Sequence, residues 1–248
     1  MSEYHKINTV FKRDIENKSK ALLEGQYSNE YFEYLALMDW VWTEKVDGTN
    51  IRIIVDPIAN GGRISFGGRT ANAQIPASLI NRLEELFFHQ SAKLNEDFPN
   101  GAVLYGEGYG AKIQKVGALY RPDQDFVLFD VKVGNWWLKR PDLENVASTF
   151  GLSVVPIVGR GNLLEMVEFV KVGFNSTWTH GGAFRAEGVV ARPVVELKTR
   201  SGNRIITKLK CSDFAEKEKP NGSHFHRPGE ANQEMENNFI SPAGLIGL

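Results

Sequence analysis

The stretch that decides the fold is Trp42-Thr43-Glu44-Lys45-Val46-Asp47-Gly48-Thr49-Asn50, which sets one lysine between two predicted strands. Residues 50–55 alternate polar and apolar side chains, as a half-buried strand does, and Asp47-Gly48 is a common hairpin turn. Lys45 is therefore predicted at the end of a strand beside a tight turn, where its amine is held rigidly enough to act as a nucleophile. The competing interpretation is an ordinary surface lysine at a strand end.

The pattern on either side predicts an α+β fold with mainly antiparallel sheets and flanking helices. Short β-type runs separated by turn residues predict two more hairpins, at Gly134-Asn135 and at Ser201-Gly202-Asn203. Apolar residues at helical spacing predict helices over residues 76–88, 141–150 and 162–172, the last two closed by a glycine.

The composition is that of an ordinary soluble globular chain, with 42% hydrophobic and 24% charged residues among 248. A formal net charge of -1 excludes a strongly basic domain, so any nucleic-acid surface must be local. The single cysteine, and the lack of a signal sequence or of an apolar stretch of about 18 to 20 residues, favour a cytoplasmic protein over a membrane or exported one. We expect one domain over residues 1–215 and a polar tail or short appendage over residues 216–248.

Five further motifs follow the Lys45 stretch in a fixed order. They are Gly67-Gly68-Arg69-Thr70, Leu104-Tyr105-Gly106-Glu107-Gly108, Phe126-Val127-Leu128-Phe129-Asp130, Ala186-Glu187-Gly188-Val189-Val190 and Thr207-Lys208-Leu209-Lys210. Together they resemble the covalent nucleotidyltransferase superfamily of ATP-dependent ligases and capping enzymes. The resemblance implies the ligase-type adenylyltransferase fold over about residues 42–219.

Within that superfamily the chain is most similar to the phage nick-sealing RNA ligases, the RNA ligase 2 family. DNA ligases and capping enzymes usually have an arginine at the position of Asn50, whereas RNA ligase 2 relatives have asparagine. The similarity extends to Ile113-Gln114-Lys115, Gly159-Arg160-Gly161 and Gly202-Asn203-Arg204. One departure is Arg192, which stands where the phage enzymes carry lysine.

The lysines of the last motif explain how Lys45 could react. A free lysine has a pKa of about 10.4, so a nucleophilic lysine needs neighbours that destabilise its ammonium form. Lys208 and Lys210 alternate along one predicted strand and share a face, so both can reach one phosphate and disfavour a third positive charge on Lys45. The competing interpretation of this pair is a solvated sheet face.

Two glutamates lie in or beside apolar strands, where an ionised carboxylate is costly without a partner. The resemblance implies that Glu107 accepts a hydrogen bond from the ribose and that Glu187 holds metal-bound water near the phosphates, with Asp47 as a weaker metal candidate. The alternative is that each carboxylate pairs with a lysine across the sheet.

The resemblance also implies a set of nucleotide-binding residues. It gives Phe129 a place against the adenine, although its alternation with valines also fits a core position, and it gives Arg69 a contact with the nucleotide or the 5′-phosphate. The full set is Glu44, Lys45, Val46, Asn50, Arg69, Glu107, Phe129, Glu187, Lys208 and Lys210. We interpret Trp136-Trp137 as hairpin packing rather than a platform for bases.

The activity implied is that of an ATP-dependent RNA ligase. Lys45 would take AMP from ATP, pass it to a 5′-phosphate, and a 3′-hydroxyl would displace it, with Mg²⁺ (or Mn²⁺) assisting. The expected partner is RNA, or an RNA-containing duplex with 3′-hydroxyl and 5′-phosphate ends, bound by a monomer in the phage or host cytosol. Its expected basic surface comprises Lys112, Lys115, Arg69, Arg192 and Arg204.

Three alternatives stay open at this point. Two belong to the same superfamily, a DNA ligase and a GTP-using capping enzyme, and the third is a non-catalytic nucleotide- or RNA-binding module. No OB-fold or full C-terminal domain is expected after the last motif, which leaves the choice between nicked duplexes and single-strand ends undecided.

Overall fold

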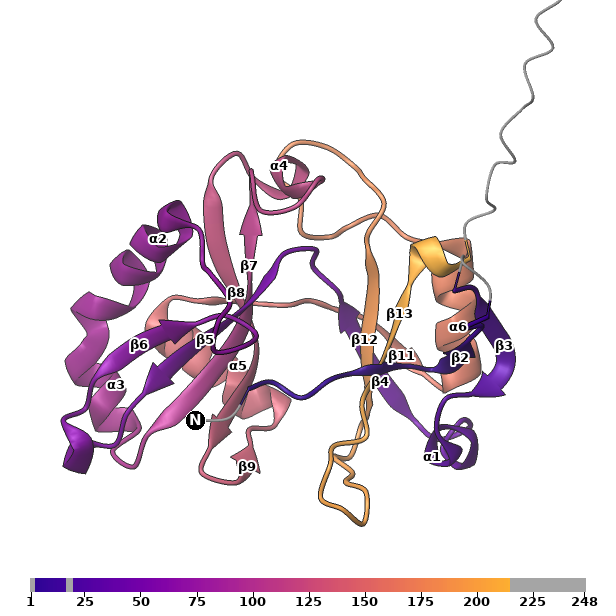
Figure 1. The fold of residues 1–248 in the computed structure, drawn as a ribbon, viewed down its shortest axis with the longest axis horizontal. Coiled ribbons are helices and arrows are strands. Elements are labelled where there is room, and N and C mark those ends of the chain that lie inside the picture. Colours follow the sequence, from indigo (N-terminus) through magenta and orange to yellow (C-terminus); the bar gives the residue numbers. More distant parts are fainter. Residues whose placement is uncertain (1–2, 17–19, 215–248) are drawn as a thin grey trace, which may run out of the picture. The chain divides into compact units, whose positions relative to one another are not determined.

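The computed structural model describes residues 3–16 and 20–214, whose strands form two large sheets and one small one (Figure 1). The five-stranded sheet has the order β1 (Asn8–Thr9), β13 (Thr207–Lys210), β12 (Gly188–Pro193), β4 (Trp40–Glu44) and β11 (Ile157–Gly161). The six-stranded sheet has the order β10 (Ser153–Val154), β8 (Gln124–Val133), β7 (Ala102–Gly110), β5 (Thr49–Val55) and β6 (Ile64–Gly67), with β9 (Trp136–Trp137) also pairing with β8. A two-stranded sheet joins β2 (Phe11–Arg13) to β3 (Leu22–Tyr27).

The strands are mainly antiparallel and the helices flank the sheets, which confirms the predicted class. Only β1 with β13 and β10 with β8 run parallel among the described strand pairs. The helices are α1 (Glu30–Tyr34), α2 (Ala77–Phe87), α3 (Ser91–Asp97), α4 (Gly117–Tyr120), α5 (Arg140–Phe150) and α6 (Leu163–Val172), with short 3-10 turns at Ile58–Asn60, Phe88–Gln90 and Cys211–Asp213.

The three predicted helices correspond to α2, α5 and α6. Gly151 ends α5 in the left-handed conformation, with φ of 63°, which glycine adopts without steric cost. Asn162 and Glu165 form a reciprocal capping box at the start of α6.

Each large sheet has its own apolar core. In the six-stranded sheet, side chains such as Ile53 and Leu104 pack with Leu83 of α2 and Leu143 of α5. In the five-stranded sheet, Trp40 and Val189 pack with Met166 of α6. One cavity is lined by residues of both sheets, so each core supports one wall of that cavity.

Two predicted hairpins are confirmed, but the one at Asp47-Gly48 is wrong. Strands β8 and β9 pair across Gly134-Asn135, and Lys198 bridges to Arg204 across Ser201-Gly202-Asn203. By contrast, β4 and β5 belong to different sheets, so residues 45–48 cross from one sheet to the other. Gly48 is required for another reason: a Cβ there would lie 2.3 Å from the carbonyl oxygen of Gly108.

The tail predicted over residues 216–248 lies outside the described residues. Across 3–16 and 20–214, none of the helices combines the length and apolar character needed to span a bilayer.

Candidate active site

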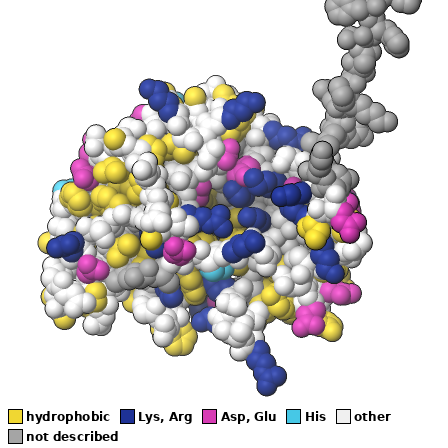
Figure 2. Space-filling model, in the orientation of Figure 1, with side chains coloured by type: hydrophobic (Ala, Val, Ile, Leu, Met, Phe, Trp, Pro, Cys, Tyr) yellow, Lys and Arg dark blue, Asp and Glu magenta, His cyan; other side chains and the backbone are white. Residues whose placement is uncertain are grey.

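A cavity of about 450 Å³ is lined by both large sheets, and every residue predicted for the site lies in its wall. These residues are Glu44, Lys45, Val46, Asp47, Asn50, Arg69, Glu107, Phe129, Glu187, Lys208 and Lys210. Figure 2 shows Lys and Arg side chains gathered in the middle of the face that it presents. The structure therefore brings the separate motifs to one place.

Lys45 sits at the crossing between the sheets, and Glu187 holds its amine. The Lys45 backbone N–H donates to the Gly188 carbonyl at 2.9 Å, which fixes the residue against β12. Its Nζ lies 2.5 Å from Glu187 Oε2, and Lys210 Nζ lies 2.6 Å from Glu187 Oε1. Glu187 thus pairs with lysines, the alternative that the sequence left open, and it bridges two of them.

Lys208 and Lys210 lie on one face of β13, as their alternation predicts, while Thr207 and Leu209 are buried on the other. Burial, followed by the charges of Lys45 and Arg69, lowers the pKa of Lys208. Burial would also lower the pKa of Lys210, but its hydrogen bond to Glu187 and the charge of that carboxylate raise it. The two lysines therefore differ in how firmly they hold their protons.

The carboxylates of the cavity influence one another. Burial raises the pKa of Glu107 to about 8; the charge of Lys45 lowers this pKa, and the charges of Glu187 and Asp47 raise it. Burial, and then the charge of Glu187, also raises the pKa of Asp47. Glu107 lies on β7 directly opposite Asn50 of β5, the strand that begins just after residues 45–48.

The segment on each side of Lys45 is anchored by residues that sequence reasoning missed. The buried Glu44 carboxylate accepts hydrogen bonds from the Ser176 hydroxyl and, at 2.9 Å each, from the Thr177 backbone N–H and hydroxyl. The Asp47 backbone N–H donates to the Tyr120 hydroxyl oxygen at 3.1 Å. Because these partners are about 70 and 130 positions away, no local pattern could have identified them.

The far end of the cavity is built around Phe129 and Asp130. The Tyr4 ring lies 5.1 Å from the Phe129 ring, and its hydroxyl donates to Asp130 Oδ2 at 2.5 Å. Asp130 also accepts from Arg192 Nη1 at 3.1 Å and from Arg204 Nη1 at 2.8 Å. Burial would raise the pKa of Asp130, but the charges of the two arginines outweigh it and lower the pKa below its usual range.

The expectation that Arg204 belongs to the RNA-binding surface is wrong. The Arg204 side chain is only 2% exposed, and it pairs with Asp130 and with Glu196 through two hydrogen bonds of 2.5 and 2.9 Å. A guanidinium that is buried and held by two carboxylates in this way forms part of the wall and is not available to an RNA phosphate. Lys112 and Lys115, in contrast, are exposed as expected.

Comparison with known proteins identifies the family and the fold. A family model described as RNA ligase matches residues 38–210, well over half of the chain. The fold is similar to that of the Naegleria gruberi RNA ligase. A variant solved with ATP and Mn has 18% identity and a TM-score of 0.57, covering 85% of this chain and 56% of its own. An apo variant has 17% identity and a TM-score of 0.55, covering 86% and 58%.

The form of that ligase solved with PPi has 18% identity and a TM-score of 0.54, covering 73% of this chain and 52% of its own. At such identities the likeness concerns the fold, and the chain spans little more than half the length of these solved relatives. This similarity confirms the predicted ligase-type nucleotidyltransferase fold. The narrower assignment to the RNA ligase 2 family stays a prediction. From the match over residues 38–210, the chain belongs to the RNA ligase family.

Proposed function

We propose that this protein is an ATP-dependent RNA ligase in which the Lys45 amine is the nucleophile. The observation that carries the proposal is the meeting of the Lys45 amine, Glu187 and Lys210 in one cavity of a chain from this family. The cavity volume of about 450 Å³ falls within the range usual for small-molecule sites.

The first step is attack on the α-phosphate of ATP. The Lys45 ammonium loses its proton, a bond forms from Nζ to the α-phosphorus, and the bond from that phosphorus to the pyrophosphate oxygen breaks. Lys208 and Lys210 stabilise the charge that develops on the phosphoryl oxygens. AMP then passes to a 5′-phosphate, and a 3′-hydroxyl displaces it to form the phosphodiester bond.

Several residues of the cavity suit a nucleotide. The side-chain oxygen of Asn50 is buried and has no hydrogen-bond partner among the described residues, so a donor group of a ligand would satisfy it. Phe129 offers a ring for the base, and Glu107 and Arg69 lie in the same wall. Because the Glu44 carboxylate is engaged by Ser176 and Thr177, a nucleotide contact from this residue would come from its backbone.

Glu187 and Asp47 would hold the divalent metal ion. Within the described residues, no group of three or more acidic, His or Cys side chains gathers as a closed metal cage. Mg²⁺ fits such a site, because it is usually bound through one or two carboxylates together with water and substrate phosphates. When bound, the ion neutralises charge on the phosphates.

The substrate and setting are also part of the proposal. RNA, or an RNA-containing duplex with 3′-hydroxyl and 5′-phosphate ends, is the polynucleotide to be joined, and the protein acts as a monomer in the cytosol. Asn50, together with membership of the family, supports RNA over DNA as the substrate.

Intact-mass measurement after incubation with ATP and Mg²⁺ tests the proposal directly. We expect the mass to rise by one AMP, Lys45→Ala to abolish the rise, and GTP to produce none. The control is Lys93→Ala, which removes a lysine on α3 outside the cavity and should keep the AMP adduct. A wild-type protein that never gains AMP would favour a non-catalytic module, and an adduct that persists in Lys45→Ala would rule out this nucleophile.

A further inference from the structure

Two hairpins from different sheets form a second basic surface, which we call the tryptophan edge. It consists of Lys132, Trp136, Trp137, Lys198 and Arg200. Trp136 is 75% exposed, so the interpretation of this residue as hairpin packing is wrong, whereas Trp40 and Trp42 are at most 3% exposed. A bare indole on the surface is unusual, since a large apolar side chain in water often marks a binding surface.

The charge of these hairpins contrasts with that of the whole chain. Residues 131–139 contain two cations and no acid, and residues 194–204 contain three cations and one glutamate, so together they carry +4 in a chain of net charge -1. That glutamate, Glu196, is bound by Arg204. The positive charge is therefore concentrated locally, as a polyanion-binding surface requires.

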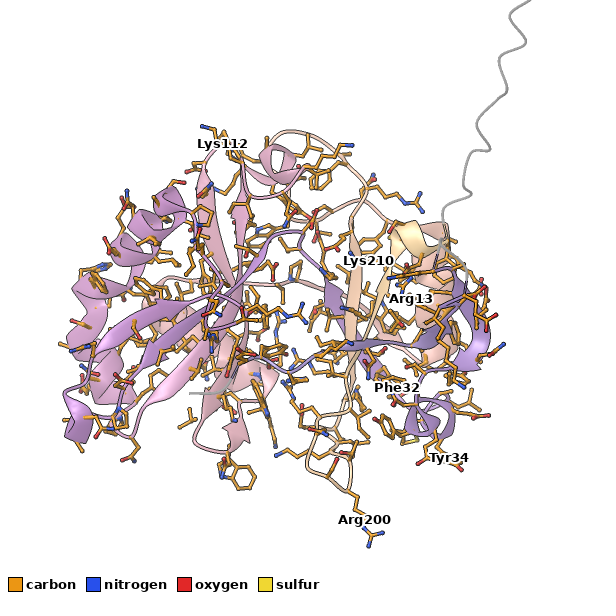
Figure 3. The ribbon with its side chains drawn as sticks, in the orientation of Figure 1. Arg13, Phe32, Tyr34, Lys112, Arg200 and Lys210 are labelled. Carbon is orange, nitrogen blue, oxygen red and sulfur yellow. The ribbon has the colours of Figure 1, made fainter. Side chains whose placement is uncertain are left out.

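Packing holds the cations beside the indoles. Lys198 Nζ lies 5.7 Å from the centre of the Trp136 ring, and Lys132 Nζ lies 5.6 Å from that of Trp137. The Arg204 guanidinium lies 4.4 Å from the Trp137 ring and fixes the two hairpins to each other. Figure 3 shows Arg200 projecting from the tip of its hairpin, where its charge is free to meet a strand.

The tryptophan edge adjoins the end of the cavity that holds Phe129 and Asp130. The Trp137 ring lies 5.6 Å from Tyr4 and 5.8 Å from His5, and both of these residues line the cavity wall. A strand that enters the cavity can therefore pass over this edge without crossing an acidic surface of the two hairpins.

We propose that the tryptophan edge binds an unpaired stretch of the RNA substrate, with one base stacked on Trp136 and the adjacent phosphates near Lys198 and Arg200. An exposed indole accepts any base, but only a base released from its duplex can reach it. The proposal rests on the proposed RNA ligase function and adds to it a preference for single-stranded RNA next to the ends being joined.

Binding of a fluorescein-labelled single-stranded oligoribonucleotide, followed by anisotropy, tests the tryptophan edge. We expect Trp136→Ala to weaken binding about 5- to 150-fold, the effect of losing one base–aromatic stack, and Trp136→Phe to recover most of it. For a blunt duplex that contains the same strand, Trp136→Ala should weaken binding less. RNA should quench indole emission in the wild type, and most of this quenching should disappear in Trp136→Phe.

Tyr34→Ala is the matched control. Tyr34 is 80% exposed, and the segment around it, residues 28–40, contains three acids and no lysine or arginine, so its removal should leave RNA binding unchanged. Combined Lys198→Gln and Arg200→Gln should weaken binding and flatten its salt dependence. Binding within twofold of the wild type in Trp136→Ala, or an equal loss for duplex and single strand, would overturn the proposal.

AMP transfer to Lys45 needs no RNA, so it separates this inference from the proposed function. A wild type that forms lysyl-AMP and binds RNA, combined with Trp136→Ala that binds RNA equally well, contradicts the tryptophan edge alone. A wild type that forms no lysyl-AMP contradicts the proposed function, whatever the RNA binding of the variants.

Discussion

The two ends of the cavity use the same arrangement for different purposes. At the lysine end, Glu187 bridges Lys45 and Lys210, and at the arginine end, Asp130 bridges Arg192 and Arg204. The side chains of Lys45, Glu187 and Lys210 are 14 to 40% exposed, whereas Asp130 and Arg204 are only 1 and 2% exposed and Arg192 is 18% exposed.

This difference in burial determines what each cluster can do. Partly exposed ion pairs exchange partners with water and ligands at low cost, and the ammonium groups of lysine are point charges that adapt to a phosphate. A buried carboxylate between two planar guanidinium groups is closed, because losing any partner leaves an unpaired charge in a low dielectric. The lysine end is thus suited to reaction and the arginine end to holding Phe129 in place.

The largest effect on folding is expected at the arginine end. Asp130→Ala leaves the buried Arg204 with one partner fewer and should lower the free energy of unfolding by about 3 to 5 kcal/mol, measured by urea denaturation. The control is Asp123→Ala, which removes a carboxylate that is 64% exposed while Arg121 keeps its contact with Asp125. If both variants unfold at the same urea concentration, the arginine end is not closed as described.

The lysine end should show the reverse pattern. Lys208→Ala and Lys210→Ala should each raise the barrier to lysyl-AMP formation by about 2.7 to 4 kcal/mol, a loss of two to three orders of magnitude in rate. Their stability should change much less than that of Asp130→Ala, because the Lys210 side chain is 40% exposed. Adenylylation within a few-fold of wild type would instead support the solvated sheet face as the role of that lysine.

The effect that is smallest over a single pH unit is that of ionisation, in which the two ends should have opposite signs. Burial raises the pKa of Glu107 to about 8, so between pH 4.5 and 8 the folded state holds a proton that the unfolded state has lost. Its contribution to stability therefore falls as pH rises, by up to about 1.4 kcal/mol per pH unit. The pKa of Asp130 is lowered, so its stabilising effect should be lost only in acid.

Comparing urea denaturation of Glu107→Gln and wild type across this pH range isolates the effect. The variant cannot ionise at residue 107, so its stability should decline less steeply between pH 4.5 and 8. Parallel curves for the two proteins would mean that Glu107 is ionised in the folded state at neutral pH.

Much of the site could be predicted because its residues occur in short motifs. The strand with Lys208 and Lys210 alternates with buried residues, which already places the two lysines on one face. Helices α2, α5 and α6 were predicted for a similar reason, since apolar spacing and capping residues act over a few positions. By contrast, the misinterpretation of Asp47-Gly48 arose because a glycine required by a distant carbonyl looks the same in sequence as a glycine in a turn.

The sequence by itself determined the fold class, the positions of the predicted helices and a set of site residues that all line the cavity, because these depend on local periodicity and on motif order. Only the tertiary structure decided which polar groups meet: Glu187 with two lysines, Glu44 with Ser176 and Thr177, and Tyr4 with Asp130. The tertiary structure also decided which side chains are exposed: Arg204 is buried, and Trp136 lies on the surface. Residues of identical type and local pattern differ in these respects because pairing and burial are set by the packing of one sheet beside the other, and that packing depends on contacts between residues far apart in the chain.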